Sequence, residues 1–229
     1  MRVYKGFTLA EVLITLLIIG VIASIVIPGI INDTREAEFN AGVKKAYADL
    51  SAAIKMIQAN NGGEVNVGTA DTQVAAETLR NDFCNVMSCV QTSNSSNSFY
   101  SINYKGYKGG SISWNARALA LNAPIAALNN GYLIRFIAYG SCANNYGVNA
   151  CGYLHIDING TKGPNMLGKD LYMFWIARKN GNGTYLIIPT GTQNDTYADF
   201  PDGCQANSID FQTSDGCAAK RLTDPDHMP

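Results

Sequence analysis

The feature that most constrains this chain is an uncharged, mostly apolar run from Val12 to Ile31. A helix of this length spans roughly 30 Å, which is the thickness of the hydrocarbon core of a bilayer. One carboxylate, on Glu11, stands at the head of the run. A carboxylate near the bilayer centre costs about 2.5–3.5 kcal/mol, so an acid at the edge of such a run requires a compensating interaction.

Several kinds of N-terminal segment contain such an apolar run. The simplest is a membrane anchor in which Glu11 is incidental. A secretory signal peptide is disfavoured because the run is long and no A-x-A cleavage pattern closes it. A lipoprotein signal is disfavoured because the first cysteine is Cys84. Arg2 and Lys5 both precede the run, so we expect the leader to stay cytoplasmic and the rest of the chain to cross the membrane.

The residues around Glu11 form a more specific pattern. Gly6-Phe7-Thr8-Leu9-x-Glu11, followed by an apolar helix, resembles the class III signal of type IV pilins and of the pseudopilins of type II secretion systems. The resemblance implies a prepilin peptidase that cuts between Gly6 and Phe7 and methylates the new amine of Phe7. It also implies that the apolar helices form a filament core, in which Glu11 faces the charged amine of Phe7 in the adjacent subunit.

The same resemblance implies where the protein works and with what. Its partners would be other pilin or pseudopilin subunits, the prepilin peptidase, an inner-membrane assembly platform and the membrane. It would span the bacterial inner membrane once, with an extracytoplasmic head domain in the periplasm or on a surface filament. The implied function is that of a structural subunit, a minor pilin or pseudopilin of a type IV pilus or type II secretion filament, and not of an enzyme.

The helix continues beyond the apolar run. From Phe39 to Ile57, apolar residues recur at three- and four-residue spacing and form one stripe. The stretch Asn60–Gly63 is a helix stop. Pro28 removes one hydrogen bond and clashes with the preceding turn, so we expect a kink there. In the family that the chain resembles, a proline at this place marks where the helix can loosen inside the filament.

We therefore expect four segments and an α+β fold. The segments are a leader peptide at residues 1–6, a transmembrane or filament-core helix at 7–31, an amphipathic helix half at 32–61 and a globular head domain at 62–229. In this pilin-like fold the long N-terminal helix, membrane-spanning in its first half, packs on an antiparallel β-sheet, and a disulfide staples the C-terminal loop.

Periodicity and turn residues predict the elements of the head. Serine and asparagine predict a loop at Gln91–Ser98, and alanine and leucine predict a short helix at Arg117–Leu128 that Pro124 interrupts. The other predicted elements are a helix at Thr72–Met87 and strands at Tyr132–Tyr139, Gly152–Ile158, Leu171–Arg178 and Thr184–Pro189, the last two joined by a hairpin at Lys179–Gly183.

Six cysteines, all after the apolar run, indicate disulfides formed in an oxidising compartment. No C-x-x-C or His-rich pattern suggests zinc. Many pairings are open to six cysteines, and their grouping in the sequence favours the neighbours Cys84–Cys89, Cys142–Cys151 and Cys204–Cys217. In pilins a C-terminal disulfide loop often shapes the surface exposed on the filament, and the last pair resembles it in placement.

A Gly/Pro-rich loop between two predicted strands gathers oxygen donors that could hold Ca²⁺, which takes about six to eight oxygen ligands. The candidate side chains are Asp157, Asn159, Thr161 and Asp170. The loop departs from an EF-hand, because its glycine is misplaced and no glutamate closes it. It resembles an Asp-x-Asn-Gly-x-x-x-Pro-Asn-x-x-Gly-x-Asp loop of many pilin-like proteins. The alternative to a calcium site is a tight turn in which Asp and Asn hydrogen-bond their own backbone.

No pattern in the sequence predicts catalysis. It contains no P-loop, no dinucleotide fingerprint, no H-E-x-x-H and no G-x-S-x-G elbow. His155 falls on the polar face of a predicted strand, where we expect a surface or satisfied residue. The stretch Tyr104–Gly110 alternates aromatic and basic residues, which could stack on nucleic-acid bases or form a solvated loop. A net charge of −1 argues against nucleic acid as a partner.

A second function remains open beside the filament subunit. The chain could be a membrane-tethered extracytoplasmic enzyme or ligand-binding domain that uses the helix only as an anchor. The N-terminus of the mature protein discriminates between the two, because only the filament subunit is expected to begin at Phe7.

Overall fold

The computed structural model describes residues 6–68, 73–94, 104–107, 123–142, 147–179, 183–192, 204, 217–225 and 228. The chain divides into two compact units, Met1–Glu38 and Phe39–Pro229. The first helix, α1 (Leu9–Asn60), contributes to both.

The first unit contains the apolar half of α1. The exposed fractions of its large apolar residues run from 44% at Val12 to 79% at Leu9. Among the described residues, α1 is the one helix long and apolar enough to cross a membrane, and none of its most apolar window is buried. The chain itself therefore leaves this surface uncovered, and lipid or other protein has to cover it.

Pro28 lies within α1 and does not end it. Proline has no N–H to donate to the carbonyl of Ser24, one turn earlier. The residues on both sides of Pro28 are nevertheless helical. The proline thus removes one backbone hydrogen bond from a helix that continues through it.

The second unit begins where α1 becomes amphipathic. As the spacing predicts, one stripe of α1 is buried, and it consists of Phe39, Val43, Ala46, Leu50, Ala53, Ile54, Ile57 and Gln58. After α1 ends at Asn60, Gly62 and Gly63 adopt φ angles of +66° and +99°. Such angles favour glycine, so this pair follows the end of the helix, as the predicted helix stop requires.

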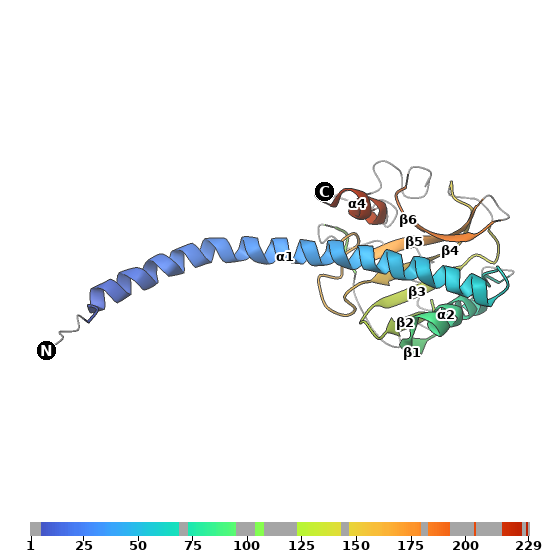
Figure 1. Cartoon of the computed structure of the whole chain (residues 1–229), viewed down its shortest axis with the longest axis horizontal. Helices are drawn as coiled ribbons and strands as arrows, with labels where there is room; N and C mark the ends of the chain where they lie inside the picture. Colours follow the sequence, from blue (N-terminus) through green and yellow to red (C-terminus); the bar gives the residue numbers. More distant parts are fainter. Residues whose placement is uncertain are drawn as a thin grey trace. The chain divides into compact units, whose positions relative to one another are not determined.

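A six-stranded antiparallel sheet forms the centre of the second unit (Figure 1). Its strands follow one another in sequence order and each pairs with the next. They are β1 (Cys89–Ser93), β2 (Ile125–Leu128), β3 (Leu133–Ala138), β4 (Ala150–Asp157), β5 (Leu171–Arg178) and β6 (Tyr185–Pro189). The four predicted strands are confirmed as β3 to β6, within two residues of their predicted bounds. The β5–β6 hairpin is confirmed by its pairing, although residues 180–182 lie outside the described residues.

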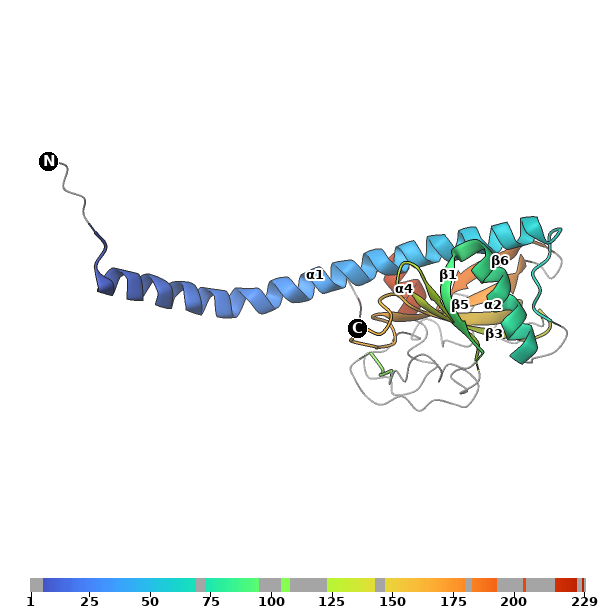
Figure 2. The same ribbon diagram turned by 90° about the horizontal axis from the view of Figure 1, so that it is seen from below.

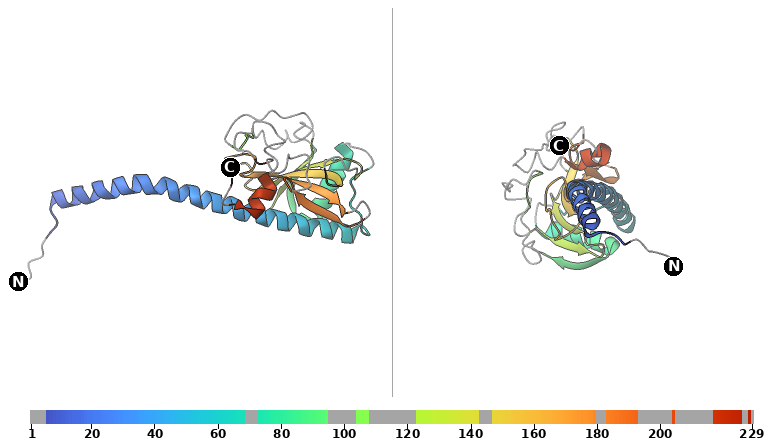
Figure 3. Two further views of the ribbon diagram at one scale, coloured as in Figure 1. Left: turned by 90° about the horizontal axis from the view of Figure 1, so that it is seen from above. Right: turned by 90° about the vertical axis from the view of Figure 1, so that its left-hand side faces the viewer.

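One face of the sheet packs against the second half of α1 and against α2 (Gln73–Met87), as Figures 2 and 3 show. Two aromatic pairs mark this core. The rings of Phe83 and Phe136 are 5.5 Å apart, and those of Tyr47 and Phe174 are stacked at 6.0 Å. A short helix, α4 (Cys217–Thr223), packs beside β5. The fold is therefore α+β, with helices layered on an antiparallel sheet.

The opposite face of the sheet is also buried, which rules out the surface alternative predicted for His155 and leaves the satisfied one. Tyr153, Trp175 and Tyr139 form an aromatic cluster there, with ring centroids 5.8–6.5 Å apart. His155 is 1% exposed and Asp157 is 1% exposed. The alternating pattern of β4 thus separates two buried faces, and His155 is not a surface residue.

Two further predictions in the head are wrong in their described parts. Residues 91–93 of the expected loop at Gln91–Ser98 belong to strand β1, in which Gln91 pairs with Ala127, and residues 95–98 lie outside the described residues. The expected helix at Arg117–Leu128 ends in strand β2, whose four residues are all buried; residues 117–122 lie outside the described residues. Burial and pairing on both sides outweigh the helix propensity of alanine and leucine.

The six cysteines form three disulfides, Cys84–Cys89, Cys142–Cys151 and Cys204–Cys217. These are the neighbouring pairs that the sequence favours. The first closes because α2 ends at Met87 and Ser88 takes a φ of +56°, which leaves the Cα atoms of Cys84 and Cys89 5.0 Å apart. The third closes the C-terminal loop, of which residues 205–216 lie outside the described residues.

Candidate functional site

The first candidate site is built around Glu11 in the first turn of α1. The Oε2 atom of Glu11 accepts hydrogen bonds from the backbone N and the Oγ1 of Thr8, each at 2.8 Å. The backbone N of Glu11 donates to Thr8 Oγ1 at 3.3 Å. This reciprocal arrangement is a capping box, which satisfies backbone donors that a helix N-terminus otherwise leaves free. Thr8 is absent from the residues predicted from the sequence, although the Thr-x-x-Glu spacing carries the signal.

The residues predicted for processing lie just before this box. Phe7 is 88% exposed. At Gly6, no described atom beyond the adjacent residues lies within 4 Å of the position that a side chain would occupy. The described residues therefore leave the bond between Gly6 and Phe7, the predicted cleavage site, exposed. The capping box involves only Thr8 and Glu11, so cutting this bond would leave it intact.

The hydroxyl groups of the apolar half bond to their own helix. Thr15 Oγ1 donates to the carbonyl of Val12 at 2.9 Å, and Ser24 Oγ donates to that of Val21 at 2.7 Å. Each hydroxyl is thereby satisfied without a partner outside the chain. Glu11 remains the one formal charge between Leu9 and the end of the apolar run.

The loop between β4 and β5 is the second candidate site, and Asp157 lies at its start. Its carboxylate accepts hydrogen bonds from the Tyr104 hydroxyl at 2.9 Å and from the backbone N of Asn159 at 3.1 Å. Burial raises the pKa of Asp157 to about 7, and the charge of Asp170 adds to this effect. The carboxylate is thus held by donors of the protein in an environment that disfavours its charge.

Asp170 ends the same loop and is fully buried. Its two oxygens accept hydrogen bonds from the backbone N of Asn165 and of Met166, each at 2.6 Å. Asn159, whose side chain bonds to Asp170, also donates from Nδ2 to the carbonyl of Gly163 at 3.2 Å. The loop is therefore folded around its own two carboxylates.

This arrangement contains the hydrogen bonds of the tight turn, and calcium binding stays a prediction. The structure brings Asp157, Asn159 and Asp170 together, while Thr161 is exposed. Within the described residues, the Oδ1 atoms of Asn159 and Asn165 are buried without a hydrogen-bond partner. Both carboxylates already accept hydrogen bonds from the protein, as the tight turn predicts. No group of three metal-ligating side chains occurs in the described part of the chain.

Chelation of divalent cations should accordingly leave the stability of the head unchanged. We expect the same midpoint of thermal unfolding for the full chain in detergent with EDTA and with excess Ca²⁺. An Asp170→Asn chain should melt at a lower temperature by the same amount in both buffers, since a buried N–H without its acceptor costs about 1–3 kcal/mol. A midpoint that falls in EDTA and recovers with Ca²⁺ would contradict this reading of the loop.

Polar groups of the outer sheet face form a buried layer around Asp157. The Arg135 guanidinium lies 5.2 Å from the centre of the Tyr104 ring. Burial, with the charge of Arg135 adding, lowers the pKa of His155 to about 3. His155 is therefore neutral at physiological pH, and its ring packs edge-on against Tyr153 at 5.3 Å. All of these side chains are buried, so they do not form an accessible catalytic site.

Within the aromatic–basic stretch, Tyr104 belongs to this buried layer, and Tyr107 packs in a separate cluster with Cys204 and Cys217. Tyr104 and Tyr107 are 5% and 6% exposed, so their rings are not free to stack on bases. The backbone of Lys105 pairs with the calcium-candidate loop, since its N donates to Asn165 O and its O accepts from Leu167 N, each at 2.9 Å. The described part of the stretch thus packs as a structural segment; residues 108–110 lie outside the described residues.

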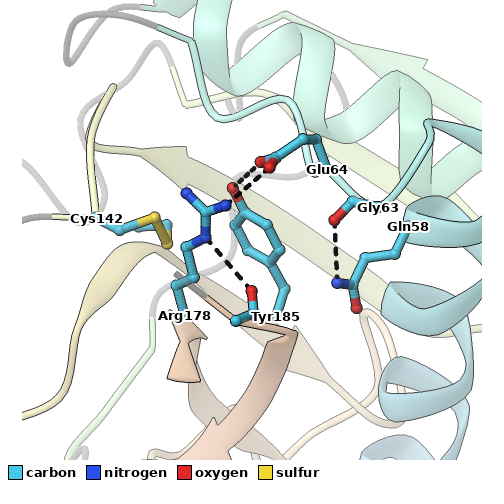
Figure 4. Close-up of polar contacts among 8 residues, drawn as sticks. Gln58, Gly63, Glu64, Cys142, Arg178 and Tyr185 are labelled. Atoms are coloured by element: carbon cyan, nitrogen blue, oxygen red, sulfur yellow. Dashed lines mark hydrogen bonds and ion pairs between the residues drawn. A yellow bond between two sulfur atoms is a disulfide. The ribbon is translucent and has the colours of Figure 1, made fainter. Parts of the chain in front are cut away.

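A third polar cluster ties the segment after α1 to the β5–β6 hairpin (Figure 4). The Glu64 carboxylate pairs with Arg178 Nη2 at 2.8 Å and accepts a hydrogen bond from the Tyr185 hydroxyl at 2.8 Å. Beside it lies an open cavity of about 540 Å³, lined also by Asn61 and Asp82. Its size is that of a ligand pocket, although its groups suggest no particular reaction.

Comparison with known families supports the first candidate site. Residues 1–27 match the family model described as the prokaryotic N-terminal methylation motif. This motif is the signature of type IV pilins and pseudopilins, so the resemblance seen at Gly6 to Glu11 is confirmed. No curated protein and no solved structure matches the chain.

The motif and the fold together support a general statement of role. The motif indicates a pilin-like substrate of prepilin peptidase that assembles with other pilin-like subunits. Together with the apolar half of α1, it indicates that the chain is anchored in a membrane. The long helix, antiparallel sheet and disulfides make the fold α+β and pilin-like.

Proposed function

We propose that this chain is a structural subunit, a minor pilin or pseudopilin, of a type IV pilus or type II secretion filament. The observation that carries the proposal is the methylation motif, placed at the start of a helix whose apolar surface the chain leaves uncovered. Such surface costs about 25 cal/mol per Å² in water. Lipid would cover this surface before assembly, and the helices of other subunits would cover it after assembly. This role would not require the chain to turn over a substrate.

Glu11 would have two partners in succession. In the single chain its carboxylate is held by Thr8. In the filament it would face the amine of Phe7 of the adjacent subunit. Two unit charges 4 Å apart attract by about 4 kcal/mol at an effective dielectric of 20. This is comparable to the cost of about 2.5–3.5 kcal/mol for a carboxylate in the membrane, so pairing would offset that cost and set the register.

The same proposal assigns a place to each segment. The leader, residues 1–6, would stay in the cytoplasm, residues 7–31 would span the inner membrane, and residues 32–61 would join the span to the head at 62–229. The head would lie outside the cytoplasm, which the three disulfides support because they form in oxidising compartments.

Mass spectrometry of the mature protein tests the proposal directly. We expect an N-terminus at Phe7 that carries a methyl group. A Gly6→Val chain should keep Met1, because the added side chain lies next to the bond to be cut, and it serves as the unprocessed control. An intact Met1 in the natural chain, or a cut beyond the apolar run, would support the alternative of a tethered enzyme or ligand-binding domain.

The alternative rests on one observation, the open cavity beside Glu64. Its lining residues include two carboxylates and two carboxamides, on Glu64, Asp82, Asn61 and Asn66. A tethered binding domain would use such a cavity and need only an anchor from α1. The methylation motif has no role in that alternative, so the filament subunit is the better supported function.

A further inference from the structure

We propose that Asn61-Gly62 is a site of spontaneous covalent modification, at which Asn61 deamidates. Asparagine followed by glycine is the dipeptide most prone to this reaction, because glycine has no side chain to hinder ring closure. The described residues contain three such pairs, Asn61-Gly62, Asn130-Gly131 and Asn159-Gly160. The structure leaves only the first of the three free to react.

The chemistry requires nothing but the chain and water. The backbone nitrogen of Gly62 loses its proton and attacks Cγ of Asn61, forming a new C–N bond. The bond from Cγ to Nδ2 breaks, and ammonia leaves with the proton. Water then opens the five-membered imide at either carbonyl, which yields aspartate or isoaspartate at position 61. The attacking nitrogen therefore has to be free, and the side chain has to be able to turn toward it.

The attacking nitrogens differ in their hydrogen bonds. Gly131 N donates to the carbonyl of Leu128 at 3.0 Å. Gly160 N donates to the Asp157 carboxylate, and Gly160 is buried. Gly62 N donates to no group in the described part of the chain, and Gly62 is exposed. A hydrogen-bonded N–H has to be released before it can react, so the folded structure protects two pairs and leaves the third unprotected.

The asparagine side chains differ in the same sense. Asn130 Oδ1 accepts a hydrogen bond from Tyr132 N at 3.2 Å, and Asn159 is held by the loop that follows β4. Asn61 is exposed and makes a longer contact, from Nδ2 to Asp82 Oδ2 at 3.4 Å. Asn61 is thus the least restrained of the three.

The modification would change the contact between α1 and α2. An amide that donates to Asp82 would become a carboxylate next to it, and burial already raises the pKa of Asp82. Glu64 lines the same cavity, so its wall would change from two acids to three. Like charges in contact repel, and we expect the end of α1 to separate from α2.

Peptide mass spectrometry of the full chain in detergent tests the site. The protein is held at mildly alkaline pH, sampled over days and digested, and the fraction converted is measured at all three asparagines. We expect conversion at Asn61 to be severalfold faster than at Asn130 and Asn159. In urea-unfolded chain the three rates should become similar, because only the fold distinguishes them. Faster or equal conversion at Asn130 or Asn159 in the folded chain, or reaction of Asn61 only in urea, would overturn the proposal.

Two substitutions test the consequence. Asn61→Asp should lower the midpoint of thermal unfolding, and adding Asp82→Asn should restore it. Asn61→Gln is the matched control, since it keeps the amide donor and slows ring closure, so its midpoint should stay unchanged while conversion at position 61 disappears. An Asn61→Asp chain with the same midpoint of thermal unfolding as the natural chain would overturn the inferred separation of α1 from α2.

Discussion

A Glu11→Val chain should insert into the membrane and lose its leader as the natural chain does, yet fail to assemble into filaments. Insertion should survive because the substitution removes a charge from the edge of an apolar run. Assembly should fail because each interface loses the proposed attraction to Phe7, about 4 kcal/mol, or up to about three orders of magnitude in the affinity of each added subunit. The measurements are membrane fractionation, the mass of the mature N-terminus and the yield of sheared filaments.

Two further variants separate charge from other effects. Glu11→Gln keeps the size and a hydrogen-bonding group, so it should fail like Glu11→Val if the charge pair is what matters. Thr15→Val is the matched control in the same helix, because the Thr15 hydroxyl bonds only to its own backbone and should be dispensable. Normal filaments from Glu11→Val would remove Glu11 from the assembly mechanism, and normal filaments from Glu11→Gln would remove the charge pair.

The parts of the fold that could be predicted from sequence are those with long or regular patterns. The stripe of α1 and the strands β3 to β6 repeat their apolar residues often enough to be unambiguous. Strand β2 could not be predicted, because its sequence Ile125–Leu128 is short and alanine-rich and becomes a strand only through pairing with β1 and β3. Such pairing is a long-range effect that local propensity does not contain.

The two candidate sites differ in the same way. Gly6, Phe7 and Glu11 could be predicted because the motif is local, and the capping box at Thr8 follows from the same few residues. The burial of Asp157 and its raised pKa could not be predicted. Alternation in β4 suggests one face in solvent, whereas a segment about fifty residues earlier, at Tyr104, covers that face and bonds to the carboxylate. Burial by distant segments is invisible in a local pattern.

Replacing either of two buried groups on β4 should expose opposite dependences of stability on pH. The pKa of Asp157 is about 7 in the folded chain against an ordinary value of 3.8, because burial disfavours its charge. Its contribution to stability is fully present below pH 3.8 and is lost as the pH rises through 7. The pKa of His155 is about 3 against an ordinary 6.5, because of burial and Arg135. Its contribution is present above pH 6.5 and is lost as the pH falls toward 3.

Between about pH 4 and 6.5 these two slopes offset each other in the natural chain, each amounting to about 1.4 kcal/mol per pH unit for one proton. Relative to the natural chain, stability should rise with pH in Asp157→Asn, which keeps the slope of His155. It should fall with pH in His155→Gln, which keeps the slope of Asp157. Asp170, whose pKa burial also raises, adds a falling slope to both variants. The contributions of His155 and Asp157 have opposite signs, so these two contributions differ by about 2.7 kcal/mol per pH unit. The pH dependence of the free energy of unfolding is measured by urea unfolding of the full chain, followed by the fluorescence of the buried Trp175. If stability depended on pH in the same way in both variants, the two groups would not titrate as their burial requires.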